Sequence, residues 1–293
     1  MIEKINYSSE EDLSLNTTKN EILWLKNEVE WSSFEYKWPW AEKLKSFLEN
    51  EHEKFLDLGN FWLLSYNLKW VIAELIKPEN KKALKRLYRF NVANNNIDQI
   101  PSNIWELKNT GELNLDNNKL TSLPKELWDM KNLTHLGFGT NEITELPIEI
   151  WNLKKLVALN WSYNKLTNIP TEIWNLKNLK SLNLSNNKIV ALPNEICDLK
   201  NLEKLYLWNN EITSLPANFG DLKNLKELVL WNNNLISLPE SMKKLDNLLT
   251  ISLKGNNIES FVLPMSWLKV NIEDWVYDLE LDEKNKVWKY EKK

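Results

Sequence analysis

One phrase returns every 23 residues through most of this chain, and it constrains the fold more than any other feature. One copy reads "LVALNWSYNKLTNIPTEIWNLKN", with apolar residues at positions 1, 4, 6, 11, 14, 18 and 21, asparagine at position 9 and proline at position 15. Eight copies follow without a gap and begin at Leu87, Thr110, Leu133, Leu156, Leu179, Leu202, Leu225 and Leu248. This period predicts a stack of similar units, because one unit cannot bury its own apolar face.

Within each repeat, two recurring residues indicate how the chain runs. Position 9 is always asparagine: Asn95, Asn118, Asn141, Asn164, Asn187, Asn210, Asn233 and Asn256. Position 15 is proline in seven copies and Val262 in the last. Alternating apolar residues before the asparagine predict a short strand with one buried face, and the proline, which lacks an N–H, should end the strand pairing. The asparagine amide can pair buried backbone groups, so Asn187→Leu should cost about 1–3 kcal/mol.

This pattern resembles the leucine-rich repeat proteins of the bacterial type, whose units read "LxxLxLxxNxLxxLPxxIxxLxN", over residues 84 to 270. The resemblance implies an α/β solenoid: a right-handed horseshoe with a parallel sheet on its concave side and turns or short helical segments on its convex side. Residues 84–262 hold the eight repeats. Neighbouring repeats are expected to bury each other's apolar residues.

The flanking regions are predicted to close the two ends of the stack. Residues 1–83 lack the repeat phrase but contain helix-like stretches, such as "WAEKLKSFLENEHEKFL", which predict a helical N-terminal cap. An alternative is a separate functional domain. Residues 263–293 alternate apolar and polar residues, which predicts a short strand or hairpin as a C-terminal cap.

Composition narrows the class of partner. The 37 basic and 41 acidic residues give a net charge of −4, so no field of one sign favours nucleic acid or an anionic membrane. The single cysteine rules out an intramolecular disulfide. No basic segment followed by an apolar core opens the sequence, and no apolar run of about 18 residues occurs. We therefore expect a cytoplasmic, monomeric protein whose partner is another protein.

Catalytic patterns are not found in the sequence. His52 and His135 lie in different regions, and no cysteine or carboxylate recurs at metal-ligand spacing. Cys197 stands at the repeat position that four other copies fill with tryptophan, where an inert structural thiol is expected. A glycine-rich phosphate loop is also missing. The sequence therefore predicts no enzyme, no metal and no cofactor.

Function is instead expected on the concave sheet, where positions 3, 5 and 7 should point outward. Near the carboxyl end these positions gather the predicted binding residues Tyr206, Trp208, Val229, Trp231, Lys204 and Glu227. Exposed aromatic residues with a charged rim are typical of protein-binding hot spots. Three other interpretations stay open: a carbohydrate-binding or surface adhesion protein, a purely structural scaffold, and isolated surface tryptophans without a partner.

The tryptophan content raises a separate hypothesis about the sequence itself. The chain has 16 Trp and only 6 Gly, and their sum of 22 is close to the roughly 20 Gly expected at average usage. Position 19 is Trp105, Trp128, Trp151 and Trp174 in the first four repeats but Gly220 in the sixth. Some bacteria read the UGA codon as glycine and others read it as tryptophan. If the gene was translated with the tryptophan reading but the source bacterium uses the glycine reading, many of these residues, including Trp208 and Trp231, are glycine in the native protein. Trp161, at an inward position beside Phe138, favours genuine tryptophan.

Overall fold

The computed structural model describes residues 38–264, 271–273, 280–282 and 287–291. Contacts divide the chain into two compact parts, Met1–Glu42 and Lys43–Lys293. In the first part, the described residues are 38–42, which include the start of helix α2 (Pro39–Glu49). All features below belong to the second part.

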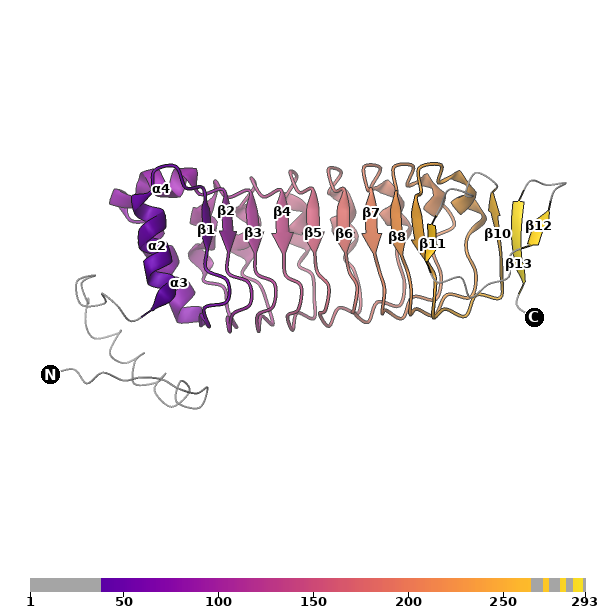
Figure 1. The fold of residues 1–293 in the computed structure, drawn as a ribbon, viewed down its shortest axis with the longest axis horizontal. Coiled ribbons are helices and arrows are strands. Elements are labelled where there is room, and N and C mark those ends of the chain that lie inside the picture. The colour runs from indigo at the N-terminus through magenta and orange to yellow at the C-terminus, as the bar shows by residue number, and fades with distance from the viewer. Residues whose placement is uncertain (1–37, 265–270, 274–279, 283–286, 292–293) are drawn as a thin grey trace, which may run out of the picture. The chain divides into compact units, whose positions relative to one another are not determined.

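A single parallel sheet of ten strands runs through the repeats (Figure 1). Each repeat contributes one three-residue strand from its positions 3 to 5, and the side chain at position 4 is buried. The strands are β1 (Phe55–Asp57), β2 (Arg89–Asn91), β3 (Glu112–Asn114), β4 (His135–Gly137), β5 (Ala158–Asn160), β6 (Ser181–Asn183), β7 (Lys204–Tyr206), β8 (Glu227–Val229), β9 (Thr250–Ser252) and β11 (Asn271–Glu273). The predicted α/β repeat architecture with a parallel sheet is confirmed.

On the side opposite the sheet, each of the first seven repeats has a short 3-10 helix. These helices are η3 (Ser102–Leu107), η4 (Lys125–Asp129), η5 (Ile148–Asn152), η6 (Thr171–Asn175), η7 (Asn194–Asp198), η8 (Phe219–Asp221) and η9 (Glu240–Lys244). In all but η8 the repeat proline is the residue before the first helical one, with extended backbone angles such as φ −65° and ψ 142° at Pro170. Proline therefore turns the chain out of the sheet and sets the start of the helix, as its fixed φ predicts.

The asparagine column pairs backbone groups between successive repeats. Asn187 donates from Nδ2 to the carbonyl oxygens of Trp161 (3.0 Å), Leu184 (3.0 Å) and Ser185 (3.2 Å), and its Oδ1 accepts the N–H of Leu166 (3.0 Å). The same set of partners recurs from repeat to repeat, and seven of the eight side chains are buried. Each asparagine thus satisfies groups that packing has removed from water.

The N-terminal end contains a strand that the repeat pattern missed. Between β1 and β2 lie helices α3 (Ser65–Leu75), η2 (Pro78–Asn80) and α4 (Lys81–Arg86), in agreement with the predicted helical cap. Strand β1 itself lies in register with β2 and extends the sheet by one strand. Asn95 bonds to this region as its counterparts bond to a preceding repeat, accepting the N–H of Leu63 (2.8 Å) and donating to the Leu58 carbonyl (2.9 Å).

The C-terminal end contains the predicted short strands. Strand β11 pairs in parallel with β9. Strands β10 (Ser260–Pro264), β13 (Val287–Glu291) and β12 (Glu280–Asp282) form a separate antiparallel sheet in that order. The domain limits after residues 83 and 262 stay predictions.

Candidate binding face on the parallel sheet

The outward positions of the repeats differ in how much side chain they expose. Positions 3 and 5 lie on the strands, and most of their side chains are at least partly exposed. Position 7 is less uniform than the expectation of an outward row: Ala93, Gly139, Ser162 and Ser185 are buried, whereas Trp208 and Trp231 are partly exposed. At position 7, only the larger side chains are exposed to solvent.

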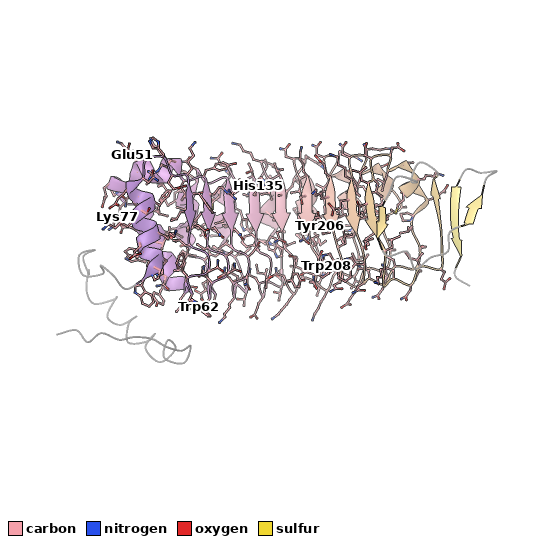
Figure 2. The ribbon with its side chains drawn as sticks, viewed as in Figure 1. Glu51, Trp62, Lys77, His135, Tyr206 and Trp208 are labelled. Carbon is pink, nitrogen blue, oxygen red and sulfur yellow. The ribbon has the colours of Figure 1, made fainter. Side chains whose placement is uncertain are left out.

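Three aromatic side chains form a continuous row above the sheet, and we call Tyr163, Trp208 and Trp231 the aromatic row. The indoles of Trp208 and Trp231 are stacked, with ring centroids 4.6 Å apart and an interplanar angle of 3°. Tyr163 meets Trp208 edge to face, with centroids 5.4 Å apart and an angle of 79°. Figure 2 labels Trp208 and Tyr206 on the same stretch of the sheet. The row spans repeats four to seven.

Tyr163 was not among the predicted binding residues, because it stands at repeat position 8. Most repeats carry asparagine there, and the backbone of this column is left-handed, with φ 52° at Tyr163. A bulky residue is rare in this conformation, whereas asparagine tolerates it. The departure from asparagine was therefore the sequence signal that could have identified Tyr163. Its side chain is 49% exposed.

The charged rim lies beside this row on β7 and β8. Tyr206 donates its hydroxyl to Glu227 Oε2 (2.9 Å), and Lys204 Nζ lies 3.7 Å from the same carboxylate oxygen. Burial, and then the hydrogen bond to Glu227, raise the pKa of Tyr206 to about 12. Val229 is the register partner of Tyr206 on the next strand. The structure thus brings all six predicted binding residues together on two neighbouring strands and the residues that follow them.

Two buried polar atoms lie in the repeat between Tyr163 and Trp208. The Ser185 hydroxyl and the Asn186 Nδ2 have no hydrogen-bond partner within the protein. The other amide atom of Asn186, Oδ1, accepts a hydrogen bond from Asn209 Nδ2 (2.9 Å). Buried polar atoms without partners are uncommon in folded proteins.

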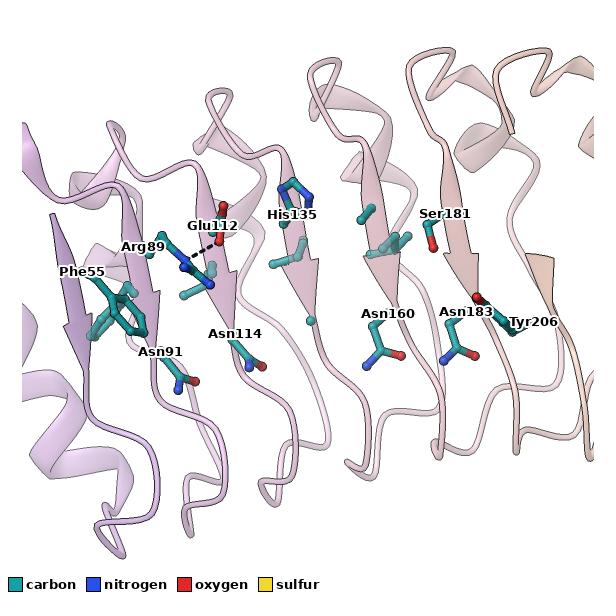
Figure 3. A pocket seen from close by; sticks show the side chains of 16 residues that line it. Phe55, Arg89, Asn91, Glu112, Asn114, His135, Asn160, Ser181, Asn183 and Tyr206 are labelled. Carbon is teal, nitrogen blue, oxygen red and sulfur yellow. Dashed lines mark ion pairs between the residues drawn. The ribbon is translucent and has the colours of Figure 1, made fainter. Parts of the chain in front are cut away.

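A trough of about 400 Å³ lies on the same face, between Phe55 on β1 and Tyr206 on β7 (Figure 3). At its first end, Arg89 pairs with Glu112 (2.5 Å) and lies over the Phe55 ring at 4.8 Å. The middle of the trough carries small side chains, including Gly137 and Ala158.

The carboxylate of Asp116 connects three neighbouring repeats. It accepts hydrogen bonds from the backbone N–H of Gly139 and from Asn160 Nδ2 (3.2 Å), so it joins repeats two and four across repeat three. Burial raises the pKa of Asp116, although these two hydrogen bonds act in the opposite direction. Glycine in repeat three makes this reach possible, since a Cβ at Gly137 would lie 2.7 Å from Asp116 Oδ1.

The residues considered for catalysis are not brought together. His135 lines the trough with its Nδ1 3.0 Å from the Thr134 hydroxyl, whereas His52 is exposed in the N-terminal region. Burial is the main cause that raises the pKa of the Cys197 thiol to about 11. Across residues 38–264 and the three short C-terminal strands, no three His, Cys, Asp or Glu side chains form a metal-binding group. In the same part of the chain, no helix is both long and apolar enough to cross a membrane.

Comparison with family profiles identifies the repeats. A profile described as "Leucine rich repeat" matches residues 85–143, 108–166 and 139–189, and one described as "Leucine-rich repeat region" matches residues 167–270. Together with the sheet and the asparagine column, these matches show that the chain belongs to the leucine-rich repeat family, as its resemblance to the bacterial repeats predicted.

Solved structures of the same fold come from bacteria and plants. A leucine-rich repeat protein of Leptospira interrogans is 36% identical over 66% of this chain and 57% of its own, with a TM-score of 0.53. The LRR ectodomain of the plant membrane receptor kinase GASSHO1/SCHENGEN3 from Arabidopsis thaliana, in complex with CASPARIAN STRIP INTEGRITY FACTOR 2, is 30% identical over 63% of this chain and 23% of its own, with a TM-score of 0.56.

PEPR1 in complex with AtPEP1 is 32% identical over 60% of this chain and 26% of its own, also with a TM-score of 0.56. The chain therefore spans between about a quarter and just over half of the length of these structures. Among curated proteins, none matches the sequence significantly.

Proposed function

We propose that this protein is a non-catalytic binding module that holds another protein against the outward face of its parallel sheet. The stacked pair of Trp208 and Trp231 carries this proposal. Parallel indoles at 4.6 Å form a rigid, partly exposed apolar surface, and the ion pair of Lys204 and Glu227 lies beside it. Rigid aromatic residues with a polar rim supply most of the binding energy in many protein interfaces.

Two of the similar solved structures support the same class of function. Both the GASSHO1/SCHENGEN3 ectodomain and PEPR1 were solved in complex with a second molecule, and both share the repeat fold at 30% identity or more. Strands in a sheet lie about 4.8 Å apart, so side chains on neighbouring repeats can contact a partner together. This regular spacing suits a partner that lies across several repeats.

Affinity capture with matched variants tests the proposal. The protein and its Trp208→Gly/Trp231→Gly variant are used to capture partners from a lysate of the source bacterium. The control is Trp105→Gly/Trp151→Gly, which removes two tryptophans, 38% and 41% exposed, from the side of the 3-10 helices. We expect a partner that the protein and the control retain and the first variant loses. Equal capture by all three would place the binding surface elsewhere.

Carbohydrate binding is the second candidate, because the flat indole stack is also suited to the face of a sugar ring. A glycan array distinguishes the two functions. Binding to an oligosaccharide that is lost in Trp208→Gly/Trp231→Gly, with no protein captured, would favour the carbohydrate-binding or adhesion function. A scaffold function predicts that no substitution on this face changes any interaction.

A further inference from the structure

The trough between β2 and β7 contains a row of amides whose orientation is fixed by the protein. At repeat position 5, the Oδ1 atoms of Asn91, Asn114, Asn160 and Asn183 each accept the N–H two residues later, at distances of 2.9 to 3.2 Å. This bond holds the amide plane in one orientation and leaves Nδ2 as the available donor. Figure 3 shows the four side chains aligned along the trough.

Two of the four donors are already used within the protein. Asn91 Nδ2 donates to Asp57 Oδ1 (2.8 Å), and Asn160 Nδ2 donates to Asp116 Oδ2 (3.2 Å). Among the described residues, Asn114 Nδ2 and Asn183 Nδ2 have no protein acceptor, although both side chains line the trough. The trough therefore presents two oriented N–H donors that can serve a ligand.

The charges and acceptors of the trough indicate which ligand fits these donors. Arg89 is paired with Glu112, and Asp116 is partly buried with both oxygens bonded, so the trough attracts neither anions nor cations strongly. The amide oxygens are also occupied by backbone N–H groups. A hydroxyl-rich sugar needs acceptors as well as donors, whereas a main-chain carbonyl needs only a donor. The free donors thus favour a peptide.

The distance between the two donors fits an extended chain. Asn114 and Asn183 lie on β3 and β6, three strands apart, which corresponds to about 14 Å. In an extended peptide the carbonyls on one edge recur every second residue, at about 7 Å, so carbonyls four residues apart match both donors. Small side chains between them, at Gly137, Ala158 and Ser181, leave room for the chain to pass.

We infer that this trough binds an extended peptide segment lying across the strands, with Asn114 and Asn183 donating to two of its main-chain carbonyls. This inference rests on the proposed function and specifies a partner with an extended segment. The aromatic row lies on repeats four to seven of the same face, so a longer partner can use both surfaces. The trough itself contains no tryptophan.

A phage-displayed library of random linear dodecapeptides, selected on the immobilised protein, supplies the probe. Binding of the most enriched peptide, made synthetically, is then measured by isothermal titration calorimetry. Asn114→Asp and Asn183→Asp keep the oxygen that accepts the N–H but replace the donor by a second acceptor. Thr250→Asp adds the same charge at position 3 of β9, outside the trough, and serves as the control. Thermal melts confirm that each variant is folded.

The inference predicts that each asparagine variant weakens binding about tenfold, as loss of one hydrogen bond implies, and that Thr250→Asp changes it less than about twofold. If only Trp208→Gly/Trp231→Gly weakens binding, the trough assignment is wrong while the proposed function stands. If no variant on this face weakens peptide binding, both the trough assignment and the proposed function are wrong. Failure of the selection to enrich any peptide overturns the inference. Binding of the protein to a saccharide on a glycan array, if Asn114→Asp abolishes it, also overturns the inference, because it assigns the trough to a saccharide.

Discussion

The asparagine column gives the sharpest stability prediction, and Asn187→Leu is the test. After this substitution the buried N–H of Leu166 loses its acceptor, Asn187 Oδ1 at 3.0 Å. The Trp161 carbonyl keeps only a long contact with Asn164 Nδ2 at 3.5 Å. The other two carbonyls retain second donors. One orphaned donor and one weakened acceptor imply a loss of about 3 kcal/mol in the free energy of unfolding.

Urea unfolding followed by circular dichroism measures this loss, and Asn178→Leu is the matched control. Asn178 is the last residue of the preceding repeat and donates to the Lys154 carbonyl at 2.8 Å, but the bond is exposed and water can replace it. We expect the control to lose less than about 0.5 kcal/mol. An equal loss in the two variants would refute the argument that burial of the backbone groups causes the cost. The m-value must stay constant, because repeat stacks can unfold in parts.

Three further predictions concern single side chains. The Cys197 thiol, with a pKa of about 11, should not react with a thiol reagent at pH 8 unless the protein is unfolded, which a colorimetric thiol assay measures. The raised pKa of Tyr206 contributes stability to the folded protein below pH 10, and this stability is lost as the pH rises through about 12. Because Glu227 is one cause of the raised pKa, Glu227→Gln should lower the pKa of Tyr206 toward 10, which an ultraviolet titration measures. Gly139→Ala places a methyl 2.6 Å from Asn160 Nδ2 and should cost about 1–3 kcal/mol by urea unfolding.

The repeat architecture could be predicted from sequence because its determinants are local and periodic. Alternating leucines specify the strands, and proline at position 15 specifies where the chain turns away from the sheet. Strand β1 could not be predicted from this periodicity. Its residues precede β2 by 34 positions rather than 23, and Phe61 stands where the asparagine would be. The helices inserted between β1 and β2 hide the periodicity but leave the strand register intact.

The candidate site could be predicted only in part. Register alone places Tyr206 beside Val229 and Trp208 beside Trp231, because equivalent positions of successive repeats are neighbours. The trough depends on side-chain orientations that periodicity does not contain. The reach of Asp116 to Asn160, for example, requires glycine in the repeat between them. The cytoplasmic location and the monomeric state stay predictions.

The hypothesis of misread glycine codons also gains physical support from particular residues. The indole N–H groups of Trp128 and Trp174 are buried without an acceptor. At the same repeat position, Gly220 donates its N–H to the Ser241 hydroxyl (3.0 Å), and a Cβ there would lie 1.7 Å from the Ser241 carbonyl oxygen. A repeat with glycine at this position therefore packs more closely than one with tryptophan can. The indole N–H of Trp161 is also buried without an acceptor, but its ring packs on Phe138 with centroids 4.7 Å apart, closer than the 6.5 Å between Trp128 and Phe138.

At Trp62, the hypothesis of misread glycine codons can be tested by measuring the free energy of unfolding as well as the mass of the native protein. Its backbone is left-handed, with φ 59°, and its side chain is 61% exposed, so the indole gains little from packing. Glycine adopts this conformation without steric cost, so Trp62→Gly should stabilise the protein by about 1 kcal/mol in urea unfolding. Trp62→Ala keeps a Cβ and is the control. If the free energy of unfolding of Trp62→Gly is no higher than that of Trp62→Ala, the result counts against glycine at this position. The mass of the peptide that contains residue 62, taken from the native protein, identifies the residue directly.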